Sequence, residues 1–186
     1  MSAAAELARR IAPGAAAGET VIVAVEGRPG SGKTTFGAAL AAELGGIHVD
    51  IEEVYPGWEG LEEGSRLAVE ELILPAARGE TAVLPQWDWV ASRPAEPLVV
   101  EPPDFLVVSG TGSGPQSASP HLGMLVWMEL GDDERRHRAL ERDGEIFAAH
   151  WEGWSRQVEG HLARERTRER ADAVVDTSGR APLLVG

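Results

Sequence analysis

The stretch "AVEGRPGSGKTTFGAAL", Ala24 to Leu40, decides how this chain folds, because it places a glycine-rich turn between an apolar run and an alanine-rich run. It contains the pattern G-x-x-x-x-G-K-S/T, whose fixed places are held by Gly27, Gly32, Lys33 and Thr34. A strand-like run, Val21 to Val25, precedes the turn, and a helix-forming run follows from Thr35. This strand, turn and helix context is the one in which the pattern binds phosphate, so the sequence predicts a phosphate-binding loop, or P-loop.

Glycines suit this turn for a physical reason. Main-chain N–H groups can wrap a phosphate chain only where the backbone takes conformations that a Cβ disfavours. The first turn of the following helix adds free N–H donors and a partial positive charge. We therefore expect a nucleotide triphosphate, most simply ATP, on Gly27, Arg28, Pro29, Gly30, Ser31, Gly32, Lys33, Thr34 and Thr35. Lys33 would bridge the β- and γ-phosphates, and the Thr34 hydroxyl would bind Mg²⁺.

Composition narrows the class of protein. The chain has 186 residues and is 43% apolar, which suits one domain, residues 1–186. It has no apolar run of about 18 residues that could cross a membrane, and no secretion signal is recognisable. The net charge of −13 disfavours nucleic acid as a partner. Cysteine is absent, which excludes disulfides and thiolate metal sites. We expect a cytoplasmic protein with a small-molecule partner and no membrane.

Apolar runs alternate with longer amphipathic stretches, the pattern of a three-layer α/β/α fold with a parallel five-stranded sheet. The expected strands are 20–26, 46–51, 105–109, 124–130 and 173–176. The expected helices are 33–44, 61–78, 132–142 and 145–170. The proline-rich stretch 85–103 shows no helical period and predicts a loop or short edge strands. In the last helix, aromatic residues recur at helical spacing, which is typical of core packing.

A P-loop alone does not define an activity, because motors, GTPases and kinases share it. The chain has no N-K-x-D element to read guanine, and it is small for a motor domain. The favoured class is a small-molecule kinase. The sequence leaves open whether ATP or GTP is preferred.

Beyond the P-loop, four segments resemble the uridine kinase family of P-loop phosphotransferases, related in fold to nucleoside monophosphate kinases. "EEVY" at 52–55 resembles D-x-F-Y, and "GETAVLPQWDWVASR" at 79–93 resembles the substrate segment G-x-T-x-x-x-P-x-Y-D-F-V-x-H-x-R. "VEPPDFLVVSG" at 100–110 resembles V-x-P-x-D-x-V-V-x-E-G, the strand that closes the magnesium site. "DERRHRALERD" at 133–143 resembles the lid helix D-x-R-x-x-R-R-x-x-R-D. The resemblance spans most of the chain, from Val21 to Asp176.

The resemblance implies that Glu52 is the catalytic base and that the γ-phosphoryl group of ATP moves to a hydroxyl of a nucleoside or nucleoside-like acceptor. A carboxylate at the end of a sheet strand beside the P-loop can accept that proton, or hold Mg²⁺ through water. Asp50 and Glu53 compete for this role, and the three acids can also be read as a plain polar loop.

The resemblance also implies a lid at about 132–145. On a helix, Arg135, Arg138 and Arg142 share one face, and guanidinium groups suit phosphoryl oxygens. We expect Arg138 and Arg142 to be catalytic, with Lys33. The alternative is a solvated helix whose arginines pair with neighbouring acids.

The segment 52–93 would form the acceptor side. Its candidate substrate-binding residues are Tyr55, Trp58, Trp87, Asp88, Trp89 and Arg93. Flat aromatic faces suit a planar ring or a sugar, although aromatic residues in loops can also cap a core.

Three departures weaken the match to uridine kinases. Ser109 stands where the family has an acid, so Mg²⁺ would depend on Thr34, on Glu52 or its neighbours, and on water. The base-reading histidine is missing, and "YPGWEGLEEG" at 55–64 is spaced differently from the family's ribose-binding acid segment. A second glycine cluster, "GTGSG" at 110–114, lacks a following lysine and is interpreted as a flexible loop near the substrate. Two alternatives therefore remain: a kinase of another small alcohol, and a weakly active ATP-binding regulatory protein.

Overall fold

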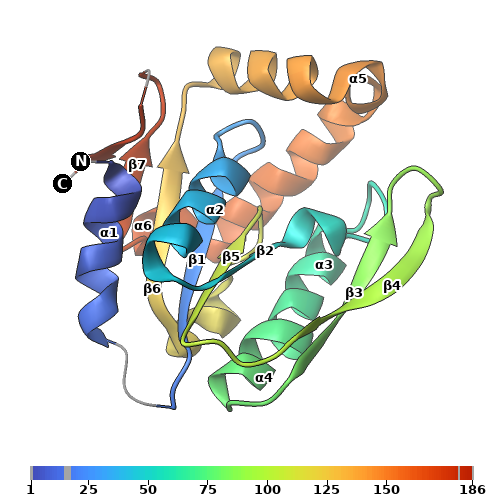
Figure 1. Ribbon diagram of the computed structural model, residues 1–186. Helices are drawn as coiled ribbons and strands as arrows, with labels where there is room; N and C mark the ends of the chain where they lie inside the picture. The colour runs from blue at the N-terminus through green and yellow to red at the C-terminus, as the bar shows by residue number, and fades with distance from the viewer. Residues whose placement is uncertain (1, 15–17, 180, 186) are drawn as a thin grey trace.

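We analysed a computed structural model of the chain, which describes residues 2–14, 18–179 and 181–185 and omits the side chains of residues 143, 145 and 146. Its centre is a six-stranded sheet in the order β2-β5-β1-β6-β7-β8 (Figure 1). The strands are β1 Val21–Gly27, β2 Ile47–Asp50, β5 Phe105–Ser109, β6 Leu122–Glu129, β7 Ala173–Asp176 and β8 Leu183–Val185. The first five in this list run parallel, and β8 pairs antiparallel with β7.

The predicted three-layer α/β/α fold is confirmed, with one strand more than expected. The five parallel strands lie within two residues of the predicted ranges. The sixth, β8, is three residues long and was not expected, because so short an apolar run carries no periodicity. It pairs only because the chain folds back after β7.

Helices cover both faces of the sheet. They are α1 Ala3–Ile11, α2 Lys33–Leu44, α3 Leu61–Leu67, α4 Leu74–Ala77, α5 Asp132–Glu165 and α6 Thr167–Arg170. A π-helical segment, 68–73, joins α3 to α4 within the predicted helix 61–78. Successive side chains of a strand point to opposite faces of the sheet, so the core has two parts. Val23, Val107 and Val126 pack with α1 and α2 on one face. Ile22, Leu106 and Val108 pack on the other face, in the core that includes apolar residues of α5.

The two helices expected at 132–142 and 145–170 meet at Gly144, where the backbone takes φ 65° and ψ −153° inside α5. A positive φ strains residues with a Cβ, so glycine allows the chain to bend there. The first half of α5 lies across the carboxyl edge of the sheet and the second half packs against the sheet (Figure 1). The last turn ends at Glu165, because Arg166 takes a left-handed conformation.

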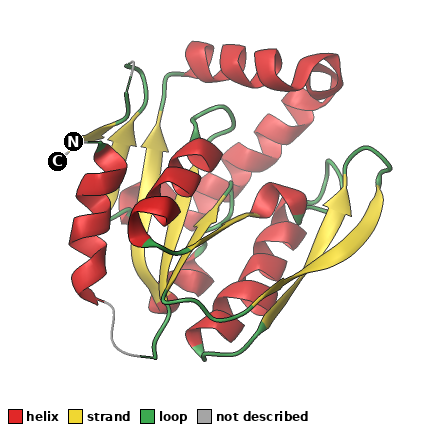
Figure 2. Ribbon diagram, viewed as in Figure 1, coloured by secondary structure: helices red, strands yellow, loops and turns green. Residues whose placement is uncertain are grey.

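The proline-rich stretch forms strands rather than a plain loop. β3, Ala82–Asp88, and β4, Arg93–Val100, form an antiparallel hairpin that is separate from the main sheet (Figure 2). The strands are longer than the short edge strands that the sequence predicted. Pro85 falls at a register irregularity between Leu84 and Gln86, where a missing N–H is tolerated.

Candidate functional site: two pockets that meet at Glu52 and Arg142

The P-loop lies at the carboxyl edge of the sheet, where β1 gives way to α2. Gly30 and Gly32 have φ values of 80° and 88°, which explains why glycine is needed at both places. The main-chain N–H groups of Gly32, Lys33 and Thr34 have no acceptor among the residues that the structure describes. These donors and the start of α2 form an anion-binding end.

Lys33 is buried, with 3% of its surface exposed, and its Nζ donates to the carbonyl of Arg28 at 3.1 Å. Burial lowers the pKa of Lys33, and the nearby carboxylates of Glu52, Glu26 and Asp50 oppose that shift. Acidic groups thus surround the ammonium group at the edge of the P-loop.

Thr34 points its hydroxyl at a carboxylate at the end of β2. Its Oγ1 donates to Asp50 Oδ2 at 2.7 Å, and Asp50 Oδ1 accepts the N–H of Glu52 at 3.0 Å. Hydroxyl, carboxylate and water oxygens are the ligands that Mg²⁺ prefers, and Mg²⁺ usually needs few of them from protein. The oxygens of Thr34 and Asp50, with Glu52 nearby, therefore fit a magnesium site. No cluster of three or more His, Cys, Asp or Glu side chains suited to a metal is found within the described residues.

Ser109 does not face this site. It is fully buried, and its Oγ lies 2.8 Å from His48 Nε2. Its partner in register on β2 is Asp50, so this acid stands one strand away from the position that carries an acid in the resembling kinases.

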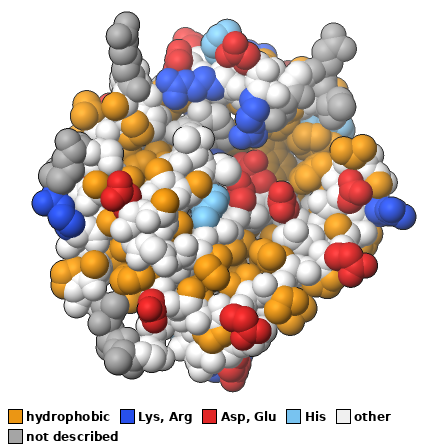
Figure 3. Space-filling view, in the orientation of Figure 1, with side chains coloured by type: hydrophobic (Ala, Val, Ile, Leu, Met, Phe, Trp, Pro, Cys, Tyr) orange, Lys and Arg blue, Asp and Glu red, His pale blue; other side chains and the backbone are white. Residues whose placement is uncertain are grey.

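A cavity of about 560 Å³, the P-loop pocket, lies above α2. Among its lining residues are Gly30, Gly32, Lys33, Thr34, Thr35, Glu52, Arg138 and Arg142. The first residues of α1 and the turn after β7 also line it, so elements from both ends of the chain close it. In the space-filling view, acidic side chains gather in a hollow below α5, and basic side chains border the hollow above (Figure 3).

The other P-loop residues are held by the surrounding protein. Arg28 makes two hydrogen bonds to the Glu159 carboxylate, at 2.7 and 2.9 Å, and does not line the P-loop pocket. The carbonyl of Ser31 accepts from the Thr177 hydroxyl at 3.1 Å. The loop is thereby fixed to α5 and to the end of β7.

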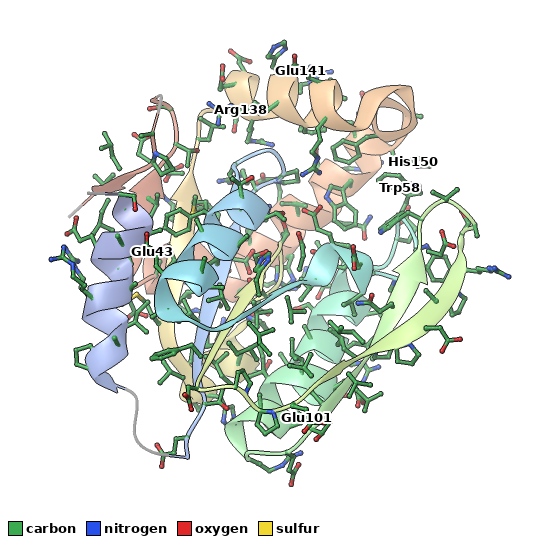
Figure 4. All side chains as sticks on the ribbon, viewed as in Figure 1. Glu43, Trp58, Glu101, Arg138, Glu141 and His150 are labelled. Carbon is green, nitrogen blue, oxygen red and sulfur yellow. The ribbon has the colours of Figure 1, made fainter. Side chains whose placement is uncertain are left out.

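The first half of α5 contacts the P-loop directly. A Cβ on Gly30 would collide with the carbonyl of Arg135, so the two backbones touch. Arg138 lines the P-loop pocket and donates to the carbonyl of Thr177 at 3.2 Å (Figure 4). Contrary to the sequence prediction, the Arg135 side chain does not join Arg138 and Arg142 at the pocket. It forms an ion pair with Asp132 at 2.9 Å, and its guanidinium lies 5.8 Å from the Trp151 ring.

A second cavity of about 670 Å³, the aromatic pocket, opens beside the first. It is lined by Pro29, Glu52, Tyr55, Trp58, Trp89, Val90, Ser92, Arg142, Phe147, His150 and Trp154. Trp58 stacks on His150, with ring centroids 4.4 Å apart and planes 9° apart (Figure 4). The hairpin closes one side, because Trp89 Nε1 donates to the carbonyl of Glu52 at 2.9 Å.

The two pockets share Glu52 and Arg142. Both residues line both cavities, and Arg142 Nη2 lies 3.6 Å from Glu52 Oε2. Tyr55 lies deeper, fully buried, and donates its hydroxyl to the carbonyl of Thr111 at 2.7 Å. Burial raises the pKa of Tyr55 well above its usual value, so the hydroxyl is a neutral donor.

The structure separates the predicted substrate residues into two groups. Tyr55, Trp58 and Trp89 line the aromatic pocket, whereas Trp87, Asp88 and Arg93 line neither cavity. Asp88 instead accepts the N–H groups of Val90 and Ala91, both at 2.9 Å, and shapes the hairpin tip. Arg93 is exposed and stands opposite Asp88 in the hairpin.

Sequence reasoning missed five residues that line the aromatic pocket: Val90, Ser92, Phe147, His150 and Trp154. Phe147 and Trp154 lie on the helix face that the sequence assigned to the core, and both are indeed buried. A helical period cannot show that one stretch of such a face also borders a cavity.

No protein-family model and no curated protein sequence matches the chain. Solved structures match its fold. A Bacillus stearothermophilus protein named as a possible uridine kinase superposes with a TM-score of 0.63 at 16% identity, over 92% of this chain and 96% of that one. A Silicibacter protein named as a candidate fructose transport system kinase gives a TM-score of 0.62 at 18% identity, with the same coverage. The chain therefore has the kinase-like P-loop fold that its motifs predicted.

Of the described residues, no helix combines the length and apolar character needed to cross a membrane.

Proposed function

We propose that the chain is an ATP-dependent phosphotransferase that moves the γ-phosphoryl group to a hydroxyl of a small acceptor, a nucleoside or nucleoside-like metabolite first. One observation carries this proposal: the P-loop pocket and the aromatic pocket meet at Glu52 and Arg142. A kinase needs a donor site and an acceptor site that share the point of transfer.

In this proposal the triphosphate lies on the P-loop, and the acceptor ring lies against the aromatic walls with its hydroxyl toward Glu52. The hydroxyl oxygen bonds to the γ-phosphorus as the bond from the γ-phosphorus to the bridging oxygen breaks, and ADP leaves. Glu52 takes the hydroxyl proton. Lys33, Arg138 and Arg142 compensate the charge on the transferring group.

Mg²⁺, when bound, would neutralise phosphate charge and align the phosphates. Thr34 and Asp50 are the residues that we propose for it, with Glu52 alongside. The 2.7 Å hydrogen bond between Thr34 and Asp50 supports this pair. Because Mg²⁺ keeps several waters and phosphate oxygens as ligands, two or three protein oxygens suffice.

A specific observation supports each of two alternative functions. The Silicibacter protein is named for a sugar rather than a nucleoside, and aromatic walls also suit sugar rings, which favours a kinase of another small alcohol as the second candidate. Ser109 in place of an acid, turned toward His48, favours a weakly active nucleotide-binding regulator as the third.

The decisive experiment measures ADP release from MgATP with a panel of nucleosides, hexoses and other small alcohols. We expect at least one acceptor to stimulate ADP release, and Glu52→Gln to lower that rate about a hundredfold with little change in ATP affinity. Glu53→Gln is the matched control, since Glu53 is exposed and lines neither pocket. A rate that no acceptor stimulates, with ATP still bound, would favour the regulator instead.

A further inference from the structure

Directly before the P-loop, β1 carries a carboxylate that the proposed transfer does not use. Glu26 is fully buried. Its Oε1 accepts the N–H groups of Gly27 at 3.2 Å and Gly112 at 2.9 Å, and its Oε2 accepts those of Gly112 at 2.9 Å and Gly114 at 3.2 Å. Glu26 thus connects the first glycine of the P-loop to residues 110–114, the glycine loop.

The glycine loop reaches from the P-loop to the aromatic pocket. On one side, the Thr111 hydroxyl donates to the carbonyl of Gly27 at 3.0 Å. On the other side, the carbonyl of Thr111 accepts the hydroxyl of Tyr55, which lines the aromatic pocket. Ser65 also donates to the carbonyl of Gly112 at 2.7 Å. An unbroken path of hydrogen bonds therefore runs from Gly27 through Glu26 and the glycine loop to the acceptor side.

The geometry of this junction calls for a side chain whose two terminal atoms both accept hydrogen bonds. All four contacts to Glu26 come from N–H donors, so both oxygens must accept. An amide of the same shape would turn its NH₂ toward a main-chain N–H and lose contacts. Burial raises the pKa of Glu26, and His161 on α5, the N–H groups of Gly112 and Gly114, and Lys33 on α2 oppose that shift. Burying a carboxylate beside a phosphate site is unfavourable, so packing alone does not explain an acid at this position.

We propose that Glu26 is a positioning residue that couples the P-loop to the acceptor pocket: occupation of the P-loop moves the Gly27 peptide, and Glu26 passes that movement to the glycine loop and Tyr55. The inference rests on the proposed function, because it takes the P-loop as a nucleotide site. Glu26 lines neither pocket and acts through the main chain of Gly112 and Gly114.

The test uses the full chain labelled with ¹⁵N-glycine and titrated with MgADP. We expect the amide resonances of Gly112 and Gly114, which line neither pocket, to shift with the same half-saturation as those of Gly30 and Gly32. In Glu26→Gln, the Gly112 and Gly114 shifts should vanish. Affinity for MgADP should fall about tenfold, as expected when hydrogen bonds to a charged group are lost.

Two variants separate positioning from general stability. Ser65→Ala removes the other side-chain contact to Gly112 and keeps the carboxylate, so the Gly112 and Gly114 responses should survive. Glu26→Asp keeps the charge and should recover at least half of the response that Glu26→Gln loses, even if the amide variant folds poorly.

The proposal is overturned if Gly112 and Gly114 do not respond in the unmodified chain, if they respond equally in Glu26→Gln, or if Glu26→Asp recovers nothing. If Gly30 and Gly32 themselves fail to respond to MgADP, the chain does not hold a nucleotide. That distinct result would remove the proposed function and this inference together.

Discussion

Two glycine-rich loops follow neighbouring parallel strands at the same edge of the sheet, yet their main-chain donors are used in opposite ways. In the P-loop, the N–H groups of Gly32, Lys33 and Thr34 have no acceptor within the described residues. In the glycine loop, the corresponding donors are satisfied by protein, since Gly112 and Gly114 donate to Glu26.

The difference shows that glycine content does not make a phosphate site. The P-loop runs into α2, whose first turn has N–H donors without an acceptor in the part of the chain that the structure describes. The glycine loop runs into a 3-10 turn at Gln116–His121 and has a carboxylate beneath it. An anion can therefore bind at the first loop, whereas at the second it would have to displace Glu26.

The largest expected effect comes from a substitution in the P-loop. Lys33→Ala should lower affinity for MgATP by at least about a hundredfold, because a buried ammonium group next to the phosphates is lost. Isothermal calorimetry measures it, with the exposed Arg78→Ala as the control. Unchanged affinity would mean that the P-loop does not hold phosphates and that the contrast between the loops has no functional meaning.

Asp50→Asn tests whether the P-loop, in contrast to the glycine loop, also has a magnesium site beside it. We expect the Mg²⁺ concentration that half-saturates ADP release to rise about tenfold, because Thr34 loses the carboxylate that holds its hydroxyl. The matched control is Asp104→Asn, an exposed acid just before β5. If both variants need the same Mg²⁺ as the unmodified chain, Asp50 has no part in the metal site.

Alanine at one glycine of each loop compares them directly. Gly30 and Gly112 have φ values of 80° and 86°, so either substitution should lower the free energy of unfolding by about 1 kcal/mol or more. Gly30→Ala should weaken MgADP binding far more than Gly112→Ala, since its Cβ would push the Arg135 backbone of α5 away from the P-loop.

Urea unfolding and calorimetry measure the two effects of these alanine variants. Gly14→Ala is the control, because Gly14 has open space around it. Equal losses of MgADP affinity in Gly30→Ala and Gly112→Ala would contradict the different roles assigned to the two loops.

The smallest effect concerns the ion pair that ties the P-loop to α5. The hydrogen bonds from Arg28 hold the pKa of Glu159 below its ordinary value. A lowered folded-state pKa stabilises the fold above the unfolded-state pKa, and this contribution is lost as the pH falls through the folded-state pKa. Because Glu159 is half-exposed, we expect less than about 1 kcal/mol.

Melting curves of Glu159→Gln and the unmodified chain should therefore differ slightly at neutral pH and converge as the pH falls through the folded-state pKa of Glu159. Glu71→Gln, at an exposed position, should follow the unmodified chain throughout. A difference between Glu159→Gln and the unmodified chain that grows on acidification would contradict the expected direction of the pH dependence.

The sequence predicted most of the fold because its signals are local. Apolar runs gave the five parallel strands, and Gly144 separated the two halves of α5. Around the site, local motifs predicted that Lys33 and Thr34 begin the helix after the P-loop and that Glu52 follows a strand beside that loop. They could not place Asp88, whose carboxylate is used by the hairpin tip, or Arg135, which packs on Trp151.

The sequence by itself determined that a glycine-rich turn joins a buried strand to a helix and carries a lysine and a threonine. These features depend on residues adjacent in the chain, where backbone conformation is decided locally. The tertiary structure decided which donors stay free, that Asp50 faces Thr34, and that Glu52 and Arg142 border two pockets at once. Those facts arise from strands and helices distant in sequence that are brought together by burial of a common core, and no local pattern encodes such distances.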